Sequence, residues 1–258
     1  MRSYQNMKFL REIKLMFVRN LRQTLRSPIF IFVSLFQPLL YLFLFMPLLN
    51  NLGGVPGLPA GKTVQIFIPG LLVMMALFGS AFVGFNLIDD IRSGVIERFL
   101  VTPMSRAPIL LGRVLRDALV LIAQCILITV VAIPLGLEVN LYGFLASLIL
   151  YAMVAVTMAS MSYSFALIYK TEDSLAPTIN TITLPLSLLS GIMLPLALAP
   201  IWLQDTAKFN PFSYAVNASR ALFAGNFMNT DVALGFGIMF ILMFVIFFWS
   251  LNSLRKID

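Results

Sequence analysis

The chain has 258 residues, of which 60% are hydrophobic and 11% charged, and its formal net charge is +7. Soluble domains carry about a quarter charged residues, so this composition excludes a soluble globular protein. The sequence contains no histidine, which excludes histidine general bases, most haem sites and zinc-type intramembrane proteases. The only cysteine, Cys125, lies in an apolar segment and allows no intrachain disulfide. We therefore expect no catalytic, cofactor-binding or metal-binding residue in this chain.

The N-terminal segment, residues 8–27, is predicted to form an amphipathic helix lying on a membrane surface. One helical face carries Leu10, Ile13, Phe17, Leu21 and Leu25, and another carries Lys8, Arg11, Arg19, Arg22 and Arg26. Such a helix places its basic side toward anionic headgroups. Ser27-Pro28 then marks the start of the first long apolar segment.

Six apolar segments are each about long enough to cross a bilayer, which needs about 20 residues. Their approximate ranges are 29–49, 64–87, 110–137, 141–168, 175–198 and 232–251. The fold class predicted is therefore an all-α polytopic membrane protein, with residues 1–28 as an interfacial helix and residues 29–254 as one six-span domain. Small residues recur at four-residue spacing in the second and fourth spans (Ala76, Ser80, Gly84; Ala155, Ala159; Ser160, Ser164), which favours close helix packing.

The stretch from Ile192 to Ala224 is moderately apolar but interrupted by prolines, and each half is too short to cross a bilayer. We expect it to form short re-entrant or interfacial helices on the outer side, between the fifth and sixth spans. Irregular backbone at that depth must be buried in protein or line a wet cavity.

The positive charges predict the orientation of the spans. If the six segments alternate across the membrane, 15 of the 18 Lys and Arg residues fall on the side that holds both termini. Only Lys62, Lys208 and Arg220 fall on the other side. Positive residues near span ends are retained in the cytoplasm, so both termini are expected there. This rule also accounts for the net charge, and we expect no nucleic-acid partner.

Residues 57–63 resemble the end of a phosphate-binding loop but do not match it. The motif requires a glycine five residues before Gly61, and the sequence has Pro56 there. The chain therefore has no visible nucleotide site of its own.

The richest polar connection runs from Ile91 to Arg106. Ile88, Ile91, Val95 and Phe99 are placed to form an apolar stripe on one short helix that ends before Thr102-Pro103. Such a helix fits two roles, a docking element for a cytoplasmic partner or an ordinary interfacial connector, and the composition alone does not separate them.

The whole chain resembles the membrane subunit of bacterial type-2 ABC exporters, the group that includes the daunorubicin-resistance permeases. The resemblance rests on the order and spacing of several short elements across nearly the whole chain. They are Gln37-Pro38, Pro69-Gly70, the loop Glu97-Arg98 to Thr102-Pro103-Met104-Ser105-Arg106, Ser190-Gly191 with Leu194-Pro195, and Asn210-Pro211-Phe212-Ser213-Tyr214.

This resemblance implies a working unit of two permease chains and two separate ATPase subunits, with ATP and Mg held by the ATPase. It implies that the loop with Arg92, Ser93, Gly94, Glu97, Arg98, Thr102 and Pro103 couples to the ATPase. It implies that Pro195, Asn210, Pro211 and Tyr214 belong to the outer gate.

Two prolines, Pro38 and Pro185, are candidate flex points, because proline removes a helical hydrogen bond; a static kink is the alternative for each. The middle of the spans carries no charged residue, which disfavours a proton- or sodium-coupled carrier and favours amphiphilic, drug-like or lipid-like cargo. A polysaccharide or glycolipid exporter and a non-transporting membrane scaffold remain as alternatives.

Overall fold

The computed structural model describes residues 2–51, 63–101, 106–192, 196 and 199–255, and all regular secondary structure within them is helical. The helices are α1 (Arg2–Leu25), α2 (Pro28–Asn51), α3 (Thr63–Ala81), α4 (Gly84–Arg92), α5 (Val95–Leu100), α6 (Arg106–Ala132), the 3-10 turn η1 (Ile133–Leu135), α7 (Leu141–Tyr169), α8 (Glu172–Leu188), α9 (Ile201–Ala207), α10 (Pro211–Phe223) and α11 (Thr230–Arg255). The prediction of an all-helical protein is confirmed for these residues.

Four helical stretches within the described residues are long and apolar enough to cross a membrane. They are Val64–Arg92, Ala107–Leu135, Leu141–Tyr169 and Thr230–Leu254, and α2 contributes a shorter apolar stretch, Phe32–Phe45. The expected second, third, fourth and sixth spans correspond to these four. The fifth expected span, 175–198, is matched by a shorter helix, because α8 ends at Leu188.

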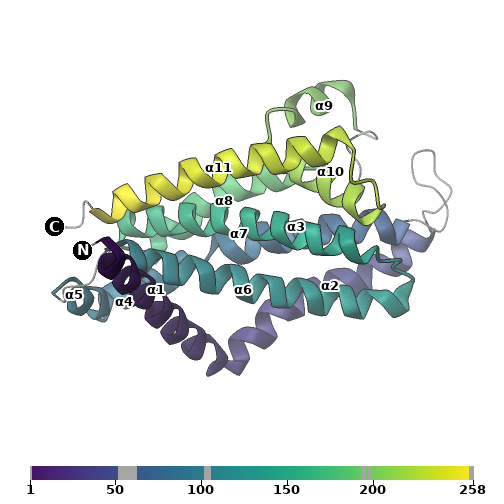
Figure 1. Ribbon diagram of the computed structural model, residues 1–258. Coiled ribbons are helices and arrows are strands. Elements are labelled where there is room, and N and C mark those ends of the chain that lie inside the picture. Colours follow the sequence, from purple (N-terminus) through teal and green to yellow (C-terminus); the bar gives the residue numbers. More distant parts are fainter. Residues whose placement is uncertain (1, 52–62, 102–105, 193–195, 197–198, 256–258) are drawn as a thin grey trace.

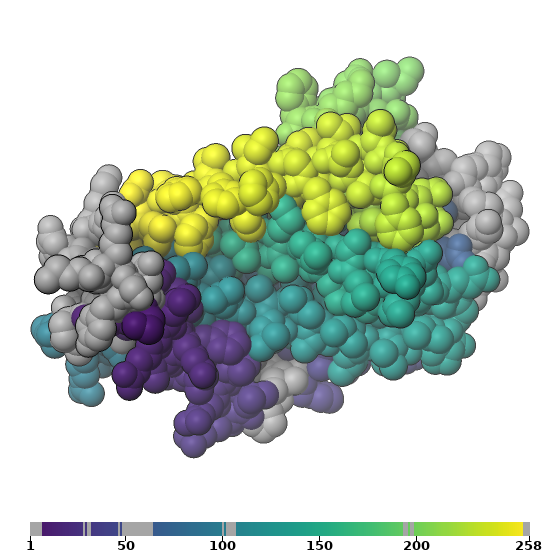
Figure 2. Space-filling model, viewed as in Figure 1, coloured from purple at the N-terminus to yellow at the C-terminus, as the bar shows by residue number. Residues whose placement is uncertain are grey.

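Two of the long helical units form the centre of the bundle, and two lie on its outside. The most apolar window of the α3–α4 unit is 78% buried and that of α7 is 72% buried, against 33% for α6 and 11% for α11. Figure 2 shows α11 running along the outside of the bundle. Its apolar side chains, including Ile241, Val245 and Phe248, are exposed as expected for a lipid-facing surface.

Small residues allow the central helices to approach closely, as the sequence predicts. Ala155, Ala159 and Ser160 are fully buried in α7. A Cβ added at Gly84 would lie 2.7 Å from the carbonyl oxygen of Ser162, so no larger residue fits where α4 begins against α7. The backbone N–H of Gly84 also donates to the Ser162 hydroxyl at 2.9 Å.

The amphipathic helix α1 lies against the start of α6, and it meets α2 at an angle at the edge of the bundle (Figure 1). The contact is tight, because a Cβ on Gly112 would lie 2.6 Å from Cβ of Met16. Leu10, Leu15 and Leu25 remain exposed on α1. Figure 1 also places the N- and C-terminal ends, α4 and α5 together at one end of the bundle, with α10 toward the other.

The apolar stripe expected on one helix is divided between two helices, which corrects the sequence prediction. Ile88 and Ile91 lie in α4, whereas Val95 and Phe99 lie in α5. Gly94 separates them with φ 69°, in the left-handed region that glycine adopts at little cost. The chain therefore turns at Gly94.

Candidate functional site

The expected coupling loop, Arg92 to Pro103, is built around α5 at the end of the bundle that holds the termini. Ser93 closes α4 by donating from its hydroxyl to the carbonyl of Asp89 at 2.8 Å. The Arg92 guanidinium pairs with Glu172 in the first turn of α8 at 2.8 Å. These contacts fix the start of the loop against two helices. Thr102 and Pro103 lie outside the described residues.

One side of α5 is anchored and the other is exposed. Ile96 is buried, and the Arg19 guanidinium lies 5.0 Å from the centroid of the Phe99 ring, a cation–π contact between α1 and α5. Glu97 and Arg98 are exposed. The helix therefore leaves an acid and a base exposed while its apolar side holds it to the protein.

A largely buried ionic cluster joins α1, α4 and α6; its members are Arg19, Asp90, Arg113, Arg116 and Asp117. Arg113 donates to the Asp90 carboxylate, which also lies 3.9 Å from the Arg19 guanidinium. Arg116 pairs with Asp117 at 3.1 Å. The side chains of Arg113, Arg116 and Asp117 are at least nine-tenths buried, so each charge needs its partner.

The ionic cluster also reaches the central helix α7, because Tyr163 donates from its hydroxyl to the Asp117 carboxylate. From the sequence, Arg113 and Arg116 counted only among the positive charges on the side of the termini, and Asp117 was given no role. The available signal was their spacing: three charged residues at i, i+3 and i+4 in an otherwise apolar helix mark an internal face.

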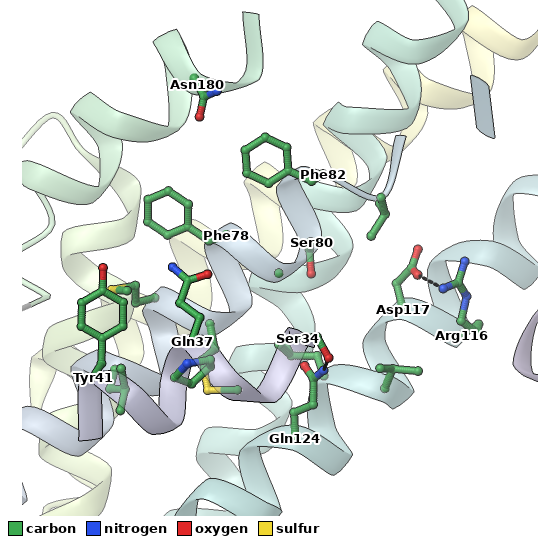
Figure 3. A pocket seen from close by; sticks show the side chains of 18 residues that line it. Ser34, Gln37, Tyr41, Phe78, Ser80, Phe82, Arg116, Asp117, Gln124 and Asn180 are labelled. Carbon is green, nitrogen blue, oxygen red and sulfur yellow. Dashed lines mark hydrogen bonds and ion pairs between the residues drawn. The ribbon is translucent and has the colours of Figure 1, made fainter. Parts of the chain in front are cut away.

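A cavity of about 240 Å³, here called the inner cavity, lies between α2, α3, α6 and α8 (Figure 3). Its polar groups come from several helices: Ser34 and Gln37 from α2, Gln124 and Asp117 from α6, and Asn180 from α8. Gln124 donates from its amide to the Ser34 hydroxyl at 2.8 Å.

Tyr41, Ser80 and Arg116 add further polar groups, and the rest of the inner cavity wall is apolar. Figure 3 shows Phe78 and Phe82 beside the polar side chains of Gln37 and Ser80. Met74, Met75 and Leu121 complete this part of the lining. A cavity that combines apolar walls with several polar groups suits a ligand that is itself amphiphilic.

The described residues of the expected outer gate lie at the start of α10. Asn210 caps this helix by accepting from the backbone N–H of Phe212 at 3.0 Å, and it donates to the Leu186 carbonyl of α8 at 2.7 Å. Pro211 follows at the first helical position, where a proline costs no hydrogen bond. Tyr214 donates to the carbonyl of Lys208 at 3.0 Å. Pro195 lies outside the described residues.

The two short helices of this region differ in their surroundings. α10 is largely buried between α3, α7 and α11, and a Cβ on Gly143 of α7 would lie 1.9 Å from the carbonyl oxygen of Leu222. By contrast, α9 stands out from the bundle (Figure 1), with Ile201 and Trp202 exposed. The structure therefore joins α10 to the bundle and leaves α9 at its surface.

Arg220 fastens α10 to two other segments through backbone carbonyl oxygens. Its guanidinium donates to Ile66 at 3.1 Å, to Gly191 at 2.7 Å and to Ile192 at 3.2 Å. Burial lowers the pKa of Arg220 to about 10, so the side chain stays charged at neutral pH. Sequence reasoning counted this arginine only as an outer charge.

The two candidate flex points lie inside continuous helices. Pro38 is buried within α2, and Pro185 is exposed one turn before the end of α8. Both helices continue through their prolines without interruption.

The sequence matches the family model described as ABC-2 type transporter over residues 11–224. It is 28% identical to the transport permease ycf38 of Cyanophora paradoxa over 218 residues, which cover 84% of this chain and 75% of that protein. It is 27% identical to the daunorubicin resistance ABC transporter permease protein DrrB1 of Streptomyces coeruleorubidus, covering 77% and 70%. It is also 25% identical to the inner membrane transport permease YadH of Escherichia coli, covering 84% and 86%.

Proposed function

The chain belongs to the ABC-2 type transporter family, and from that membership we propose that it is the transmembrane permease subunit of an ATP-driven exporter. Its cargo is an amphiphilic drug or a lipid-like molecule. Permeases of this family work with an ABC ATPase. ATP and Mg are held by that separate subunit, and this chain supplies the path through the membrane.

We propose that the chain crosses the cell membrane six times with both termini in the cytoplasm. The four long apolar units supply four crossings. α2 has 24 residues, about 36 Å at 1.5 Å per residue, which matches a hydrocarbon core of about 30 Å. α8, with 17 residues or about 26 Å, supplies the remaining crossing together with the turn at Leu189 to Ile192.

The ATPase docks on α5 in this proposal. The exposed Glu97 and Arg98 form the contact, and the anchored side of α5 passes its movement to α1 through Phe99 and Arg19. From Arg19 the ionic cluster extends to α4 and α6. Two ATPase subunits act on two permease chains, so that closure of the ATPase pair moves both copies of α5.

The inner cavity is the observation that carries the export function. Asp117 and Arg116 of α6 belong both to its lining and to the ionic cluster, which α5 contacts through Phe99 and Arg19, so the cluster connects the docking helix with the cavity. On α8, Asn180 and Thr181 are exposed side chains that a lipid-facing helix would not favour. We propose that this side of the bundle, with α2 and α3, faces the second permease chain and completes the path.

Transport assays on the complex with its ATPase test this function. Gln124→Leu removes the amide that bonds to Ser34, and we expect a fall of about tenfold in export with unchanged ATPase association. Gln65→Leu is the matched control. Gln65 does not line the inner cavity, and its side-chain amide donates to the Glu138 carboxylate. Equal export by the Gln124 variant and the wild type would show that the inner cavity is not part of the substrate path. Failure of any ABC ATPase to co-purify would favour a scaffold role.

A further inference from the structure

A second, smaller cavity lies between the interfacial helix and the bundle, and none of the functions above uses it. It measures about 190 Å³ and is lined from three helices: Asn20 and Thr24 of α1, Asp89 and Asp90 of α4, and Arg113 and Arg116 of α6. We call it the interfacial cavity. Of the residues named here, only Arg116 also lines the inner cavity.

Three buried N–H groups of this lining have no hydrogen-bond acceptor within the described part of the protein. They are Nδ2 of Asn20, Nε of Arg113 and Nε of Arg116. The three residues are 3%, 2% and 6% exposed. One terminal guanidinium nitrogen of each arginine is engaged, because Arg113 pairs with Asp90 and Arg116 with Asp117.

The orientation of the Asn20 amide follows from its neighbour. Arg19 donates from its guanidinium to Oδ1 of Asn20 at 3.3 Å, so Oδ1 is the acceptor and Nδ2 is the donor left over. A buried donor without a partner costs about 1–3 kcal/mol, and more when it is charged. Three such donors on residues that line one cavity favour an occupant whose acceptor oxygens these side chains can turn to meet, and a phosphate group supplies several.

The position of the cavity indicates the source of that phosphate. One wall is α1, whose exposed Leu10 and Leu25 lie on the same helical face and are suited to lie in a membrane surface. Phosphate groups of lipid headgroups occupy that level of a bilayer. A lipid therefore reaches this site from the leaflet at the end of the bundle that holds the termini.

The charges around the cavity indicate the headgroup type. Arg19, Arg113 and Arg116 are balanced by Asp89, Asp90 and Asp117, so a ligand with no net charge disturbs the balance least. Asp89 is exposed, and its carboxylate is available to accept from an ammonium group. We propose that the interfacial cavity binds the phosphate and ammonium groups of an aminophospholipid such as phosphatidylethanolamine.

This proposal needs the membrane location of the chain but not its export activity, so the two are tested separately. The full-length chain is purified in detergent, freed of lipid and titrated with phosphatidylethanolamine by native mass spectrometry. Phosphatidylcholine, whose quaternary nitrogen has no N–H, and inorganic phosphate are titrated in parallel. We expect phosphatidylethanolamine to bind at least about tenfold more tightly than either.

The variant Asn20→Asp keeps the acceptor for Arg19 and replaces the unpaired donor with an anionic oxygen. We expect it to weaken phosphatidylethanolamine binding at least about tenfold, because it places negative charge against the phosphate. Asn252→Asp is the matched control, since Asn252 is exposed in the last turn of α11, a helix that ends at the same end of the bundle (Figure 1), and this variant should bind the lipid as tightly as the wild type.

Asn20→Ala removes the donor without adding charge, so it controls for an effect of the new charge on folding. Its affinity for phosphatidylethanolamine should fall less than that of Asn20→Asp. Thermal unfolding of each variant in detergent checks that it is folded. Unchanged binding by folded Asn20→Asp and Asn20→Ala overturns the site. Equal loss in Asn252→Asp also overturns it. Inorganic phosphate binding as tightly as the lipid overturns the headgroup assignment.

Discussion

Asp90 joins three helices through its carboxylate, which accepts from Arg113 of α6 and lies 3.9 Å from Arg19 of α1. Arg113 is 2% exposed, so its charge depends on this partner. Breaking such a pair from one side leaves a buried charge without compensation, which costs about 3–5 kcal/mol. The adjacent Asp89 is exposed and serves as a natural comparison.

Asp90→Ala is therefore expected to lower the free energy of unfolding by about 3 kcal/mol, because the buried Arg113 guanidinium loses its carboxylate. Thermal unfolding in detergent and the yield of monodisperse protein measure the effect. Asp89→Ala should change either quantity little. Equal stability of the two variants would show that the Asp90–Arg113 pair is not what holds α4 to α6.

At the scale of helices, the bundle depends on close backbone contacts at particular glycines. α7 meets α10 at Gly143, where an added Cβ would lie 1.9 Å from a backbone carbonyl oxygen. Gly237 on α11 has nothing within 4 Å of the same position. The two glycines thus differ in surroundings, although both lie in long helices.

Gly143→Ala should destabilise the protein by about 1–3 kcal/mol, because α10 must move away from α7 to make room. Gly237→Ala should be neutral or slightly stabilising, since alanine is the better helix former. Thermal unfolding of both variants under one detergent condition checks this. A similar loss of stability in both variants would show that the cost comes from replacing a helical glycine and not from the contact between α7 and α10.

The coupling role of α5 is also argued at this scale. Glu97→Lys should leave insertion and folding unchanged, because Glu97 is exposed, while ATP hydrolysis is uncoupled from transport. Export and ATPase rates of the reconstituted complex are measured together. Asp205→Lys makes the same kind of change on exposed α9 and should leave the ratio of export to hydrolysis unaltered. Normal coupling in Glu97→Lys would contradict the role assigned to this position.

For the whole molecule, the proposed orientation has a direct chemical test. The single cysteine, Cys125, is 0% exposed and should react slowly with maleimides. In a Cys125→Ala background, Phe209→Cys, at the 89% exposed position beside α9, should be labelled by an impermeant maleimide in intact cells. Glu97→Cys should be labelled only after the membrane is opened. The reverse labelling pattern would show that the chain lies in the membrane in the opposite orientation.

Much of the helical layout could be predicted from the sequence, because long apolar runs and capping residues are local signals. α7 begins and ends within a residue of its predicted span, and Ser27-Pro28 marks the start of α2. The break at Gly94 could not be placed, since the apolar spacing of Ile91, Val95 and Phe99 fits one helix equally well.

The candidate sites were harder to predict, because their residues are distant in sequence. Gln124 meets Ser34 across 90 positions, and Arg220 meets Ile66 across 154. No local pattern contains such pairings. Asn20 illustrates the same limit: its sequence context marks an amphipathic helix, and only the packing of α1 on α6 makes its amide a buried donor.

The stacking of Arg19 on Phe99 has a mechanical consequence for the molecule. α1 carries the exposed Leu10 and Leu25 and contacts α5 through this stacked pair, so a displacement of α5 that keeps the contact also moves a helix that is suited to lie in lipid. In the proposed coupling cycle, the viscosity of the bilayer would then oppose the movement of α5. A stiffer, more ordered membrane should slow each cycle through α1, even for a cargo that never touches that helix.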